Sequence, residues 1–342
     1  MKYLKGQMHI HSNCSDGDTA PEKVAREFKN LGYDFIFFTD HFNNFDVSDI
    51  KEEGLLVMPG IEFAAKVHNP YYGKKAVIHT NALGSLREDW GILFKWVEAY
   101  CDNIDDEVFF GKKHTISEVI NLTLNEIYGY GAIPTVNHIN WWGGDFGPYD
   151  YRELLKVDLP YIMELKNASD QFEDGYKSLE SAEYVWDVLL TNGKDVFCAF
   201  TDDSHNYSKN MRDVLCENNS LPKHMIPGTT CVMVKADQNQ ESIEKALRCG
   251  DFYASTGVEI EEFTVRDKSI YVKVKDTGKT NNIIFKGKMG IPLKWVTGNE
   301  AEYTFTGSPD EEYVRVKVAD SDYNMALTQP VFQNGKKIVL PE

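Results

Sequence analysis

The chain has 342 residues, 42% of them hydrophobic and 26% charged, which is typical of a soluble globular protein with one large domain or two. Acidic residues outnumber basic ones by 53 to 36, for a net charge of −17. This balance argues against binding long nucleic acid, because contacts to a phosphate backbone need Lys and Arg. No apolar run approaches the roughly 18 residues of a membrane span, and the six cysteines form no C-x-x-C pair.

We therefore expect a cytoplasmic protein without a signal peptide, a membrane partner or disulfides. This expectation rests on the first residues, which run directly into an apolar segment. The composition leaves the oligomeric state open.

The first half of the chain alternates apolar strands with amphipathic helices. A predicted strand ends at His9 and His11, and Asp18 to Glu22 then has the features of a helix start, with a capping side chain before Pro and Glu. Gly32 is the predicted end of that helix. Further strands are predicted at 33–38, 55–61, 76–78, 132–136, 161–163 and 196–201, and further helices at 117–128, 151–157 and 178–191. This alternation predicts βα units around a parallel sheet or barrel.

The pattern changes toward the C-terminus, after a last strand–helix–strand unit at 229–256. Polar and apolar residues then alternate in strands such as 270–275 and 313–318, and no convincing helix follows. This pattern predicts a small antiparallel β-sandwich-like domain. We therefore predict two domains, 1–257 and 258–342, the second with a structural or capping role.

Six of the nine histidines lie at or just past the end of a predicted strand: His9, His11, His41, His79, His138 and His205. Three carboxylates accompany them, namely Asp16, Glu62 and Asp203. In a strand, residues i and i+2 face the same side, so the imidazoles of His9 and His11 are expected to converge. A set of nitrogen and oxygen ligands without Cys is typical of a catalytic Mn, Fe or Zn site, and nine ligands exceed the needs of one ion. The sequence therefore predicts two or three divalent ions.

Each candidate also has an ordinary structural interpretation. A single strand-end histidine is often a buried core residue, Asp16 before Gly17 is a common turn former, and Asp202 with Asp203 could cap a helix. Their coincidence at six strand ends is what favours a metal site. His68, His114 and His224 do not follow strands and are left out of it.

Five segments resemble the motifs of the PHP (polymerase and histidinol phosphatase) family. The segments are 9–17 (HIHSNCSDG), 39–41 (TDH), 59–62 (PGIE), 137–138 (NH) and 203–205 (DSH). Their order and spacing agree with the family over about residues 1–257. Residues 250–257, followed by a β domain, also resemble a subgroup of stand-alone PHP phosphoesterases.

The resemblance implies a distorted (β/α)7 barrel with a trinuclear metal centre. In this assignment one ion is held by His9, His11, Glu62 and Asp203. Glu62 bridges to a second ion, which is held with His79 and His138. The third ion is held by Asp16, His41 and His205. No ligand is missing, which argues against an inactive relative.

Such a centre predicts hydrolysis of a phosphate ester, in a small phosphorylated metabolite, by a metal-bound hydroxide that attacks phosphorus in line. Glu62 and Asp203 are the expected catalytic carboxylates, and Asp40 is expected to orient a ligand imidazole. The candidate substrate-binding residues are Trp141, Trp142, Lys166 and Asn167. The tryptophans could equally pack beneath their loop, and the other two could lie at a solvated strand end.

Three other functions remain open. The same metal centre could serve an exonuclease or oligonucleotide phosphodiesterase, although the acidic balance weighs against it. A similar barrel could carry a non-phosphate metallohydrolase such as an amidase or lactonase. The β domain could instead make the chain a carbohydrate- or protein-binding module, through aromatic residues such as Tyr303, Phe305 and Tyr313. Histidinol phosphate, nucleoside phosphates and sugar phosphates all remain candidate substrates.

Overall fold

Three β-sheets and five α-helices make up the part of the chain that the structure describes. The structure is a computed structural model, and the described residues are 2–71, 74–84, 95, 113–141, 149–167, 180–208 and 225–342. The helices are α1 (Pro21–Asn30), α4 (Ile116–Gly129), α5 (Tyr151–Leu154), α6 (Ala182–Thr191) and α8 (Gln240–Cys249). None of the described helices is long and apolar enough to cross a membrane. The fold is therefore mixed α/β, as the alternating pattern predicts.

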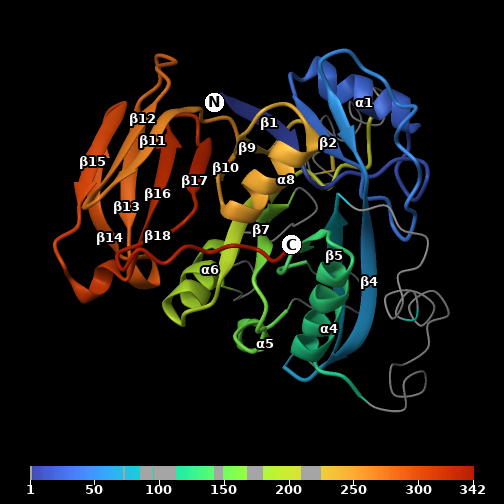
Figure 1. Cartoon of the computed structure of the whole chain (residues 1–342), viewed down its shortest axis with the longest axis horizontal. Helices are drawn as coiled ribbons and strands as arrows, with labels where there is room; N and C mark the ends of the chain where they lie inside the picture. Colours follow the sequence, from blue (N-terminus) through green and yellow to red (C-terminus); the bar gives the residue numbers. More distant parts are fainter. Residues whose placement is uncertain are drawn as a thin grey trace.

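The largest sheet has ten strands and runs through both halves of the chain (Figure 1). Its strands are β1 (Tyr3–Gln7), β2 (Phe35–Phe37), β3 (Leu56–Met58), β9 (Cys231–Lys235), β10 (Phe252–Ser255), β13 (Asn281–Lys286), β14 (Pro292–Thr297), β16 (Tyr313–Asp320), β17 (Met325–Thr328) and β18 (Val331–Phe332). The main path is β14-β13-β16-β17-β10-β9-β1-β2-β3. Because β10 pairs antiparallel with β17, one sheet continues across the predicted boundary at residue 257. The division into two domains stays a prediction.

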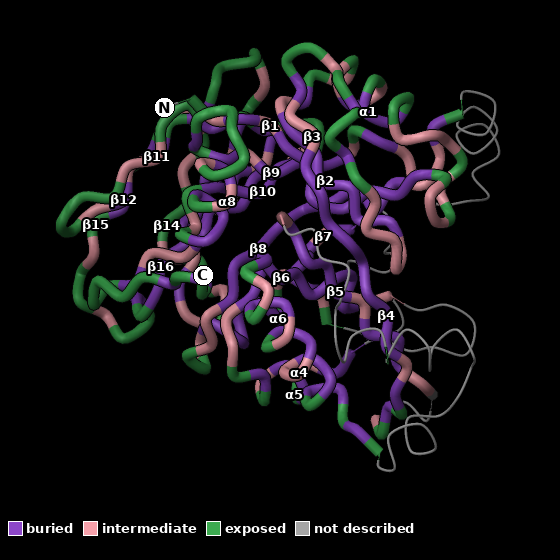
Figure 2. The backbone as a smooth tube through the Cα atoms, turned by 45° about the vertical axis from the view of Figure 1, so that its right-hand side comes forward, coloured by how far each residue is buried: buried purple, intermediate pink, exposed green. Residues whose placement is uncertain are grey.

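The C-terminal region is a sandwich of two sheets. A three-stranded sheet of β11 (Ile260–Arg266), β12 (Ser269–Val274) and β15 (Glu300–Thr304) packs on the end of the large sheet. The apolar core includes Ile270 and Val272 from the small sheet, and Ile283, Phe285 and Val316 from the large one. Figure 2 shows more exposed residues in this region, at its hairpins and along β11 and β14, than in the central strands of the molecule, which are buried. The alternating pattern after residue 258 therefore predicts this region correctly.

The third sheet has five strands in the order of the chain. They are β4 (Gly60–Asn69), β5 (Lys74–Leu83), β6 (Ile133–Val136), β7 (Tyr161–Asn167) and β8 (Val196–Thr201). β6, β7 and β8 pair in parallel, whereas β4 and β5, with ten residues each, form an antiparallel hairpin. The hairpin differs from the expected parallel βα repeat, because only residues 70–73 separate β4 from β5, and parallel strands need a much longer crossover connection. Beside this connection, the Asn69 side chain accepts a hydrogen bond from the Tyr71 amide.

The structure does not show the distorted (β/α)7 barrel that the resemblance implies, because the described strands form open sheets. The ten-stranded and five-stranded sheets meet at two isolated parallel bridges, Ile10 with Ser204 and His41 with Glu62. Both bridges lie just beyond the carboxyl ends of β1 and β2. These ends carry predicted metal ligands, so the two sheets come together at the candidate site.

Helix starts follow the expected chemistry only in part. Thr115 and Glu118 form a reciprocal capping box at α4. At α1, the N-cap is Ala20 and no side chain caps the helix, whereas the sequence predicts a capping side chain before Pro21. The Asp18 carboxylate instead accepts from the amides of Tyr207 and Ser208, so it ties the first loop to the loop after β8.

Candidate metal centre

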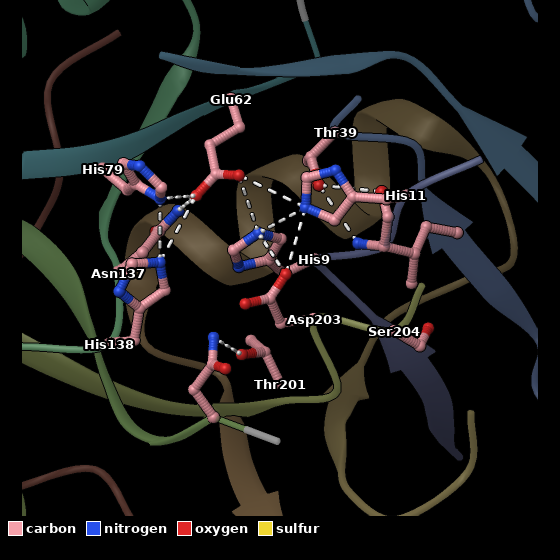
Figure 3. Close-up of polar contacts among 12 residues, drawn as sticks. His9, His11, Thr39, Glu62, His79, Asn137, His138, Thr201, Asp203 and Ser204 are labelled. Carbon is pink, nitrogen blue, oxygen red and sulfur yellow. Dashed lines mark hydrogen bonds and ion pairs between the residues drawn. The ribbon is translucent and has the colours of Figure 1, made fainter. Parts of the chain in front are cut away.

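The structure brings the nine predicted metal ligands to one place, where the two larger sheets meet. Figure 3 shows six of them: His9, His11, Glu62, His79, His138 and Asp203. Eight of the nine ligands fall into three groups. Within each group, the donor atoms lie within 4.8 Å of one another. The groups are His9, His11, Glu62 and Asp203; His41, Glu62 and His79; and His11, Asp16, His41 and His205. His138 lies beside the second group, with its Nε2 3.0 Å from His79 Nδ1. Whether these residues bind metal stays a prediction.

The first group has the size of a metal cage. His9 Nε2 and His11 Nε2 are 3.1 Å apart, and each lies 3.2 Å from Glu62 Oε2. Their distances to Asp203 Oδ1 are 3.2 and 3.0 Å. Four ligands about 2.0–2.1 Å from a tetrahedral ion would be separated by roughly 3.4 Å. The donor set therefore fits a divalent cation in size and in chemistry.

Glu62 connects this cage to the second group. Its Oε2 faces the first group and lies 3.2 Å from His41 Nδ1, while its Oε1 lies 3.1 Å from His79 Nδ1 and 3.6 Å from His138 Nε2. Asn137 donates from Nδ2 to the same Oε1 at 2.7 Å and so fixes the carboxylate. A carboxylate with one oxygen in each group is suited to bridging two ions.

The third group lies around Asp16, at the more open side of the site. Asp16 Oδ1 is 3.4 Å from His11 Nδ1 and 3.3 Å from His205 Nε2, and Asp16 Oδ2 is 3.7 Å from His41 Nε2. The side chain of Asp16 is 55% exposed, unlike the other carboxylates of the site. Asp16 is therefore the member of this group that solvent reaches most directly.

Charge balance inside the cluster separates the histidines into two kinds. Burial opposes a charged imidazole, but neighbouring carboxylates outweigh it and raise the pKa of His9 well above its ordinary value and that of His11 to about 10. Burial prevails at His41, where it lowers the pKa to about 3, and it also lowers the pKa of His79. Imidazoles must be neutral to bind metal, so ions entering the first group would displace protons from His9 and His11.

The carboxylates respond in the opposite direction. Burial alone would raise their pKa values, but the surrounding imidazoles lower the pKa of Glu62 and of Asp203 well below the ordinary range. Both side chains are almost fully buried. Ionised carboxylates in such surroundings favour a bound cation.

Two predicted ligands occupy strained backbone positions. His138 has φ 27° and Asp203 has φ 45°, in the left-handed region that residues other than glycine rarely adopt. Strain of this kind is typical of functional sites, where surrounding structure holds it.

Asp40 lies differently from expectation. Its buried carboxylate accepts hydrogen bonds from the Ser12 amide, the Ser12 hydroxyl and the Ser15 hydroxyl, rather than from a ligand imidazole. It thereby shapes the loop between His11 and Asp16. Asp202 likewise stays outside the metal groups and accepts from residues 228–230.

The predicted substrate-binding residues are only partly brought to the site. Trp141 stacks near His79, with ring centroids 6.4 Å apart and planes 24° from parallel, and Trp142 lies outside the described residues. Lys166 is half-buried near the end of β7. Asn167 is buried and donates to Glu164 and Thr201. Their contact with substrate stays a prediction.

Sequence reasoning missed Asn137 and Glu164 as members of the site. Asn137 stands next to a predicted ligand in the Asn-His pair, which was a usable signal. Glu164 accepts from His9 Nδ1 at 2.7 Å, and only its place at the end of an apolar run pointed to it. The excluded His68 is exposed on β4, as expected of a residue outside the site.

No protein-family model matches the chain, and no curated protein matches it. Solved structures are similar to it at low identity. A two-domain protein from Bacteroides vulgatus, described as containing a predicted PHP-like metal-dependent phosphoesterase, has 16% identity and a TM-score of 0.42, covering 94% of this chain and 91% of that one. A protein from Bifidobacterium adolescentis, provisionally described as a metal-dependent phosphoesterase, has 13% identity and a TM-score of 0.38, covering 62% and 95%.

An amidohydrolase from Chromobacterium violaceum, solved with bound sulfate and no metal, has 13% identity and a TM-score of 0.37, covering 60% of this chain and 88% of its own. Because each TM-score is below 0.5, we draw no conclusion about function from these likenesses.

Proposed function

We propose that this chain is a metal-dependent phosphoesterase of the PHP family that hydrolyses a small phosphorylated metabolite. The observation that carries the proposal is that the three donor groups share residues. Glu62, His41 and His11 each belong to two of the three groups. Shared ligands favour ions held close together, which is the arrangement that phosphoryl transfer uses.

The proposed ligand assignment gives two to three divalent ions, Mn, Fe or Zn. His9, His11, Glu62 and Asp203 would hold one, Glu62 with His79 and His138 a second, and Asp16, His41 and His205 the third. Such ions supply an activated water and neutralise the charge of the phosphate. In this proposal the protein itself contributes the shared charge of Glu62, the fixed orientation of the imidazoles and an open side at Asp16.

We also propose that the strands around the site are the seven strands of a distorted barrel, β1, β2, β4, β5, β6, β7 and β8. The pairing of β4 to β8 and of β1 with β2, together with the bridges Ile10–Ser204 and His41–Glu62, supports this arrangement. Barrels of this class place catalytic groups at the carboxyl ends of their strands.

The test is metal content by elemental mass spectrometry on protein purified without chelator, with p-nitrophenyl phosphate turnover measured on the same sample. Two to three ions per chain, together with turnover that is lost on chelation and restored by Mn, Fe or Zn, are the expected result. Protein that contains no metal after reconstitution would overturn the proposal and favour a binding module.

Metal without turnover of the monoester would direct the search to other bonds. Turnover of a short oligonucleotide would then identify a phosphodiesterase, and turnover of an amide or lactone a non-phosphate hydrolase. Either result would overturn the monoester assignment while keeping the metal centre.

A further inference from the structure

Glu164 is a buried carboxylate next to the candidate metal centre that belongs to none of the three donor groups. It lies on β7 and is 1% exposed. A charged group this deeply buried is costly unless it is fully paired. Its partners therefore indicate what it does.

Four hydrogen bonds reach the two oxygens of Glu164. Oε1 accepts from His9 Nδ1 at 2.7 Å and from the Thr201 hydroxyl at 2.8 Å. Oε2 accepts from the His138 backbone amide at 2.9 Å and from Asn167 Nδ2 at 2.7 Å. Four donors match the four lone-pair positions of a carboxylate, so its hydrogen-bonding capacity is full.

The bond to His9 determines which ring nitrogen faces the cage. With Nδ1 donating to Glu164, the neutral ring has its lone pair on Nε2, the atom 3.2 Å from both Glu62 and Asp203. Carboxylate partners of this kind orient metal-bound histidines and raise their basicity.

The bond to His138 acts on the backbone rather than on the ring. His138 has the strained φ of 27°, and its amide donates to Glu164 Oε2. One carboxylate therefore holds a ring from the first donor group and the backbone of a ligand beside the second.

A β-bulge in β7 makes this cradle possible. The register with β8 shifts between Glu164 and Lys166, which leaves Leu165 as the extra residue. In a regular strand, residues three apart face opposite sides, but the bulge turns Asn167 back toward Glu164. Bulges commonly re-aim side chains next to active sites.

We propose that Glu164 is a positioning residue, which sets the tautomer of His9 and holds the backbone of His138 so that both can bind metal. This inference rests on the proposed metal-dependent function. It assigns Asn167 and Thr201 to the support of Glu164.

The test is the variant Glu164→Gln in the full-length protein. In glutamine, one of the two carboxylate oxygens is replaced by an NH₂ group, which donates instead of accepting. This NH₂ group must face either the donor His9 Nδ1 or the donors of His138 and Asn167, so at least one of these hydrogen bonds is lost. Affinity for Zn²⁺ is measured on metal-free protein by competition with a fluorescent chelator. We expect a loss of about 10- to 100-fold, the range found for partners of metal-bound histidines.

The matched control is Glu311→Gln. Glu311 is also a buried carboxylate that accepts several hydrogen bonds, from Tyr303 and from the amides of residues 306–308, but it lies in the C-terminal sandwich. We expect this variant to bind Zn²⁺ as the wild type does. Thr201→Val removes one donor without changing the shape of the side chain, and it serves if Glu164→Gln fails to fold; a loss of several-fold is expected.

Proton NMR of the zinc-loaded protein separates positioning from general stability. A downfield signal from His9 Nδ1–H bonded to a carboxylate is expected in the wild type and in Glu311→Gln, and it should be lost or moved upfield in Glu164→Gln. Unchanged zinc affinity in both Glu164→Gln and Thr201→Val would overturn this inference alone. A wild-type protein that binds no Zn²⁺ or other divalent ion would overturn the proposed function as well.

Discussion

Among the three candidate carboxylate ligands, Glu62 lies close to the largest number of histidines, so Glu62→Gln is the sharpest test of the site. Its carboxylate oxygens lie 3.1–3.6 Å from nitrogens of five histidines. Glutamine keeps the shape of the side chain but removes the charge that two donor groups share. We expect turnover to be abolished and the fold to be kept.

The expected shift in Tm follows from the coupling of metal binding to stability. An ion at 100 times its Kd stabilises the folded state by about 2.7 kcal/mol. With about 2.1 cal/mol/K of unfolding entropy per residue, a chain of 342 residues gains roughly 4 °C in Tm for each ion. The wild type with three ions should therefore gain about three times as much as Glu62→Gln, which keeps only the group around Asp16 intact.

The assay is thermal unfolding of chelator-treated protein with and without saturating Mn²⁺, together with turnover. His68→Ala is the matched control, because His68 lies on the same strand, β4, with an exposed side chain. Its metal-dependent shift should equal that of the wild type. The reasoning is refuted if Glu62→Gln keeps the full shift and turnover while His68→Ala loses them.

Three further predictions concern stability, each measured by urea unfolding. Burial opposes the charge of Glu183, but three nearby cations lower its pKa below the ordinary 4.5. The ionised carboxylate therefore contributes to the free energy of unfolding in full above pH 4.5, and this contribution is lost as the pH falls. The free energies of unfolding of Glu183→Gln and the wild type should converge in acid, and a difference that stays constant with pH would contradict this. Arg315→Met should cost about 3–5 kcal/mol of stability, because it leaves the buried Asp187 without its cationic partner. Lys273→Met, which breaks an exposed ion pair, should cost less than about 1 kcal/mol. Equal losses in the two variants would argue against this. Tyr161→Phe should cost under about 1 kcal/mol, since the buried hydroxyl has no hydrogen-bond partner among the described residues, and a larger loss would reveal one.

Most members of the candidate metal site could be predicted to lie together, because each of them follows a local signal in the sequence. Each buried apolar run must end where the chain leaves the core, and a histidine or carboxylate at that point is visible in sequence. His9, His138 and Asp203 follow β1, β6 and β8 in this way. His9 and His11 were expected to converge through the two-residue period of a strand. Both lie just past the end of β1 (Tyr3–Gln7), and their Nε2 atoms are nevertheless 3.1 Å apart.

Other features depend on long-range pairing and could not be predicted this way. The apolar residues 76–78 look the same in a parallel or an antiparallel sheet, so the β4–β5 hairpin was missed, and with it the position of His79 inside a strand rather than at its end. The role of Glu164 depends on a one-residue bulge against β8. Asp40 faces serines rather than an imidazole because the loop after His11 folds back onto it.

The pairing of β10 with β17 has a consequence for synthesis of the chain. The partner of residues 253–255 is residues 326–328, so ribosomes add about seventy residues before that edge of the sheet can be covered. Until then the nascent protein presents unpaired strand groups, which invite association with other chains. Expression of the first 257 residues alone would make this passing exposure permanent, and we expect such a fragment to aggregate or to require chaperones.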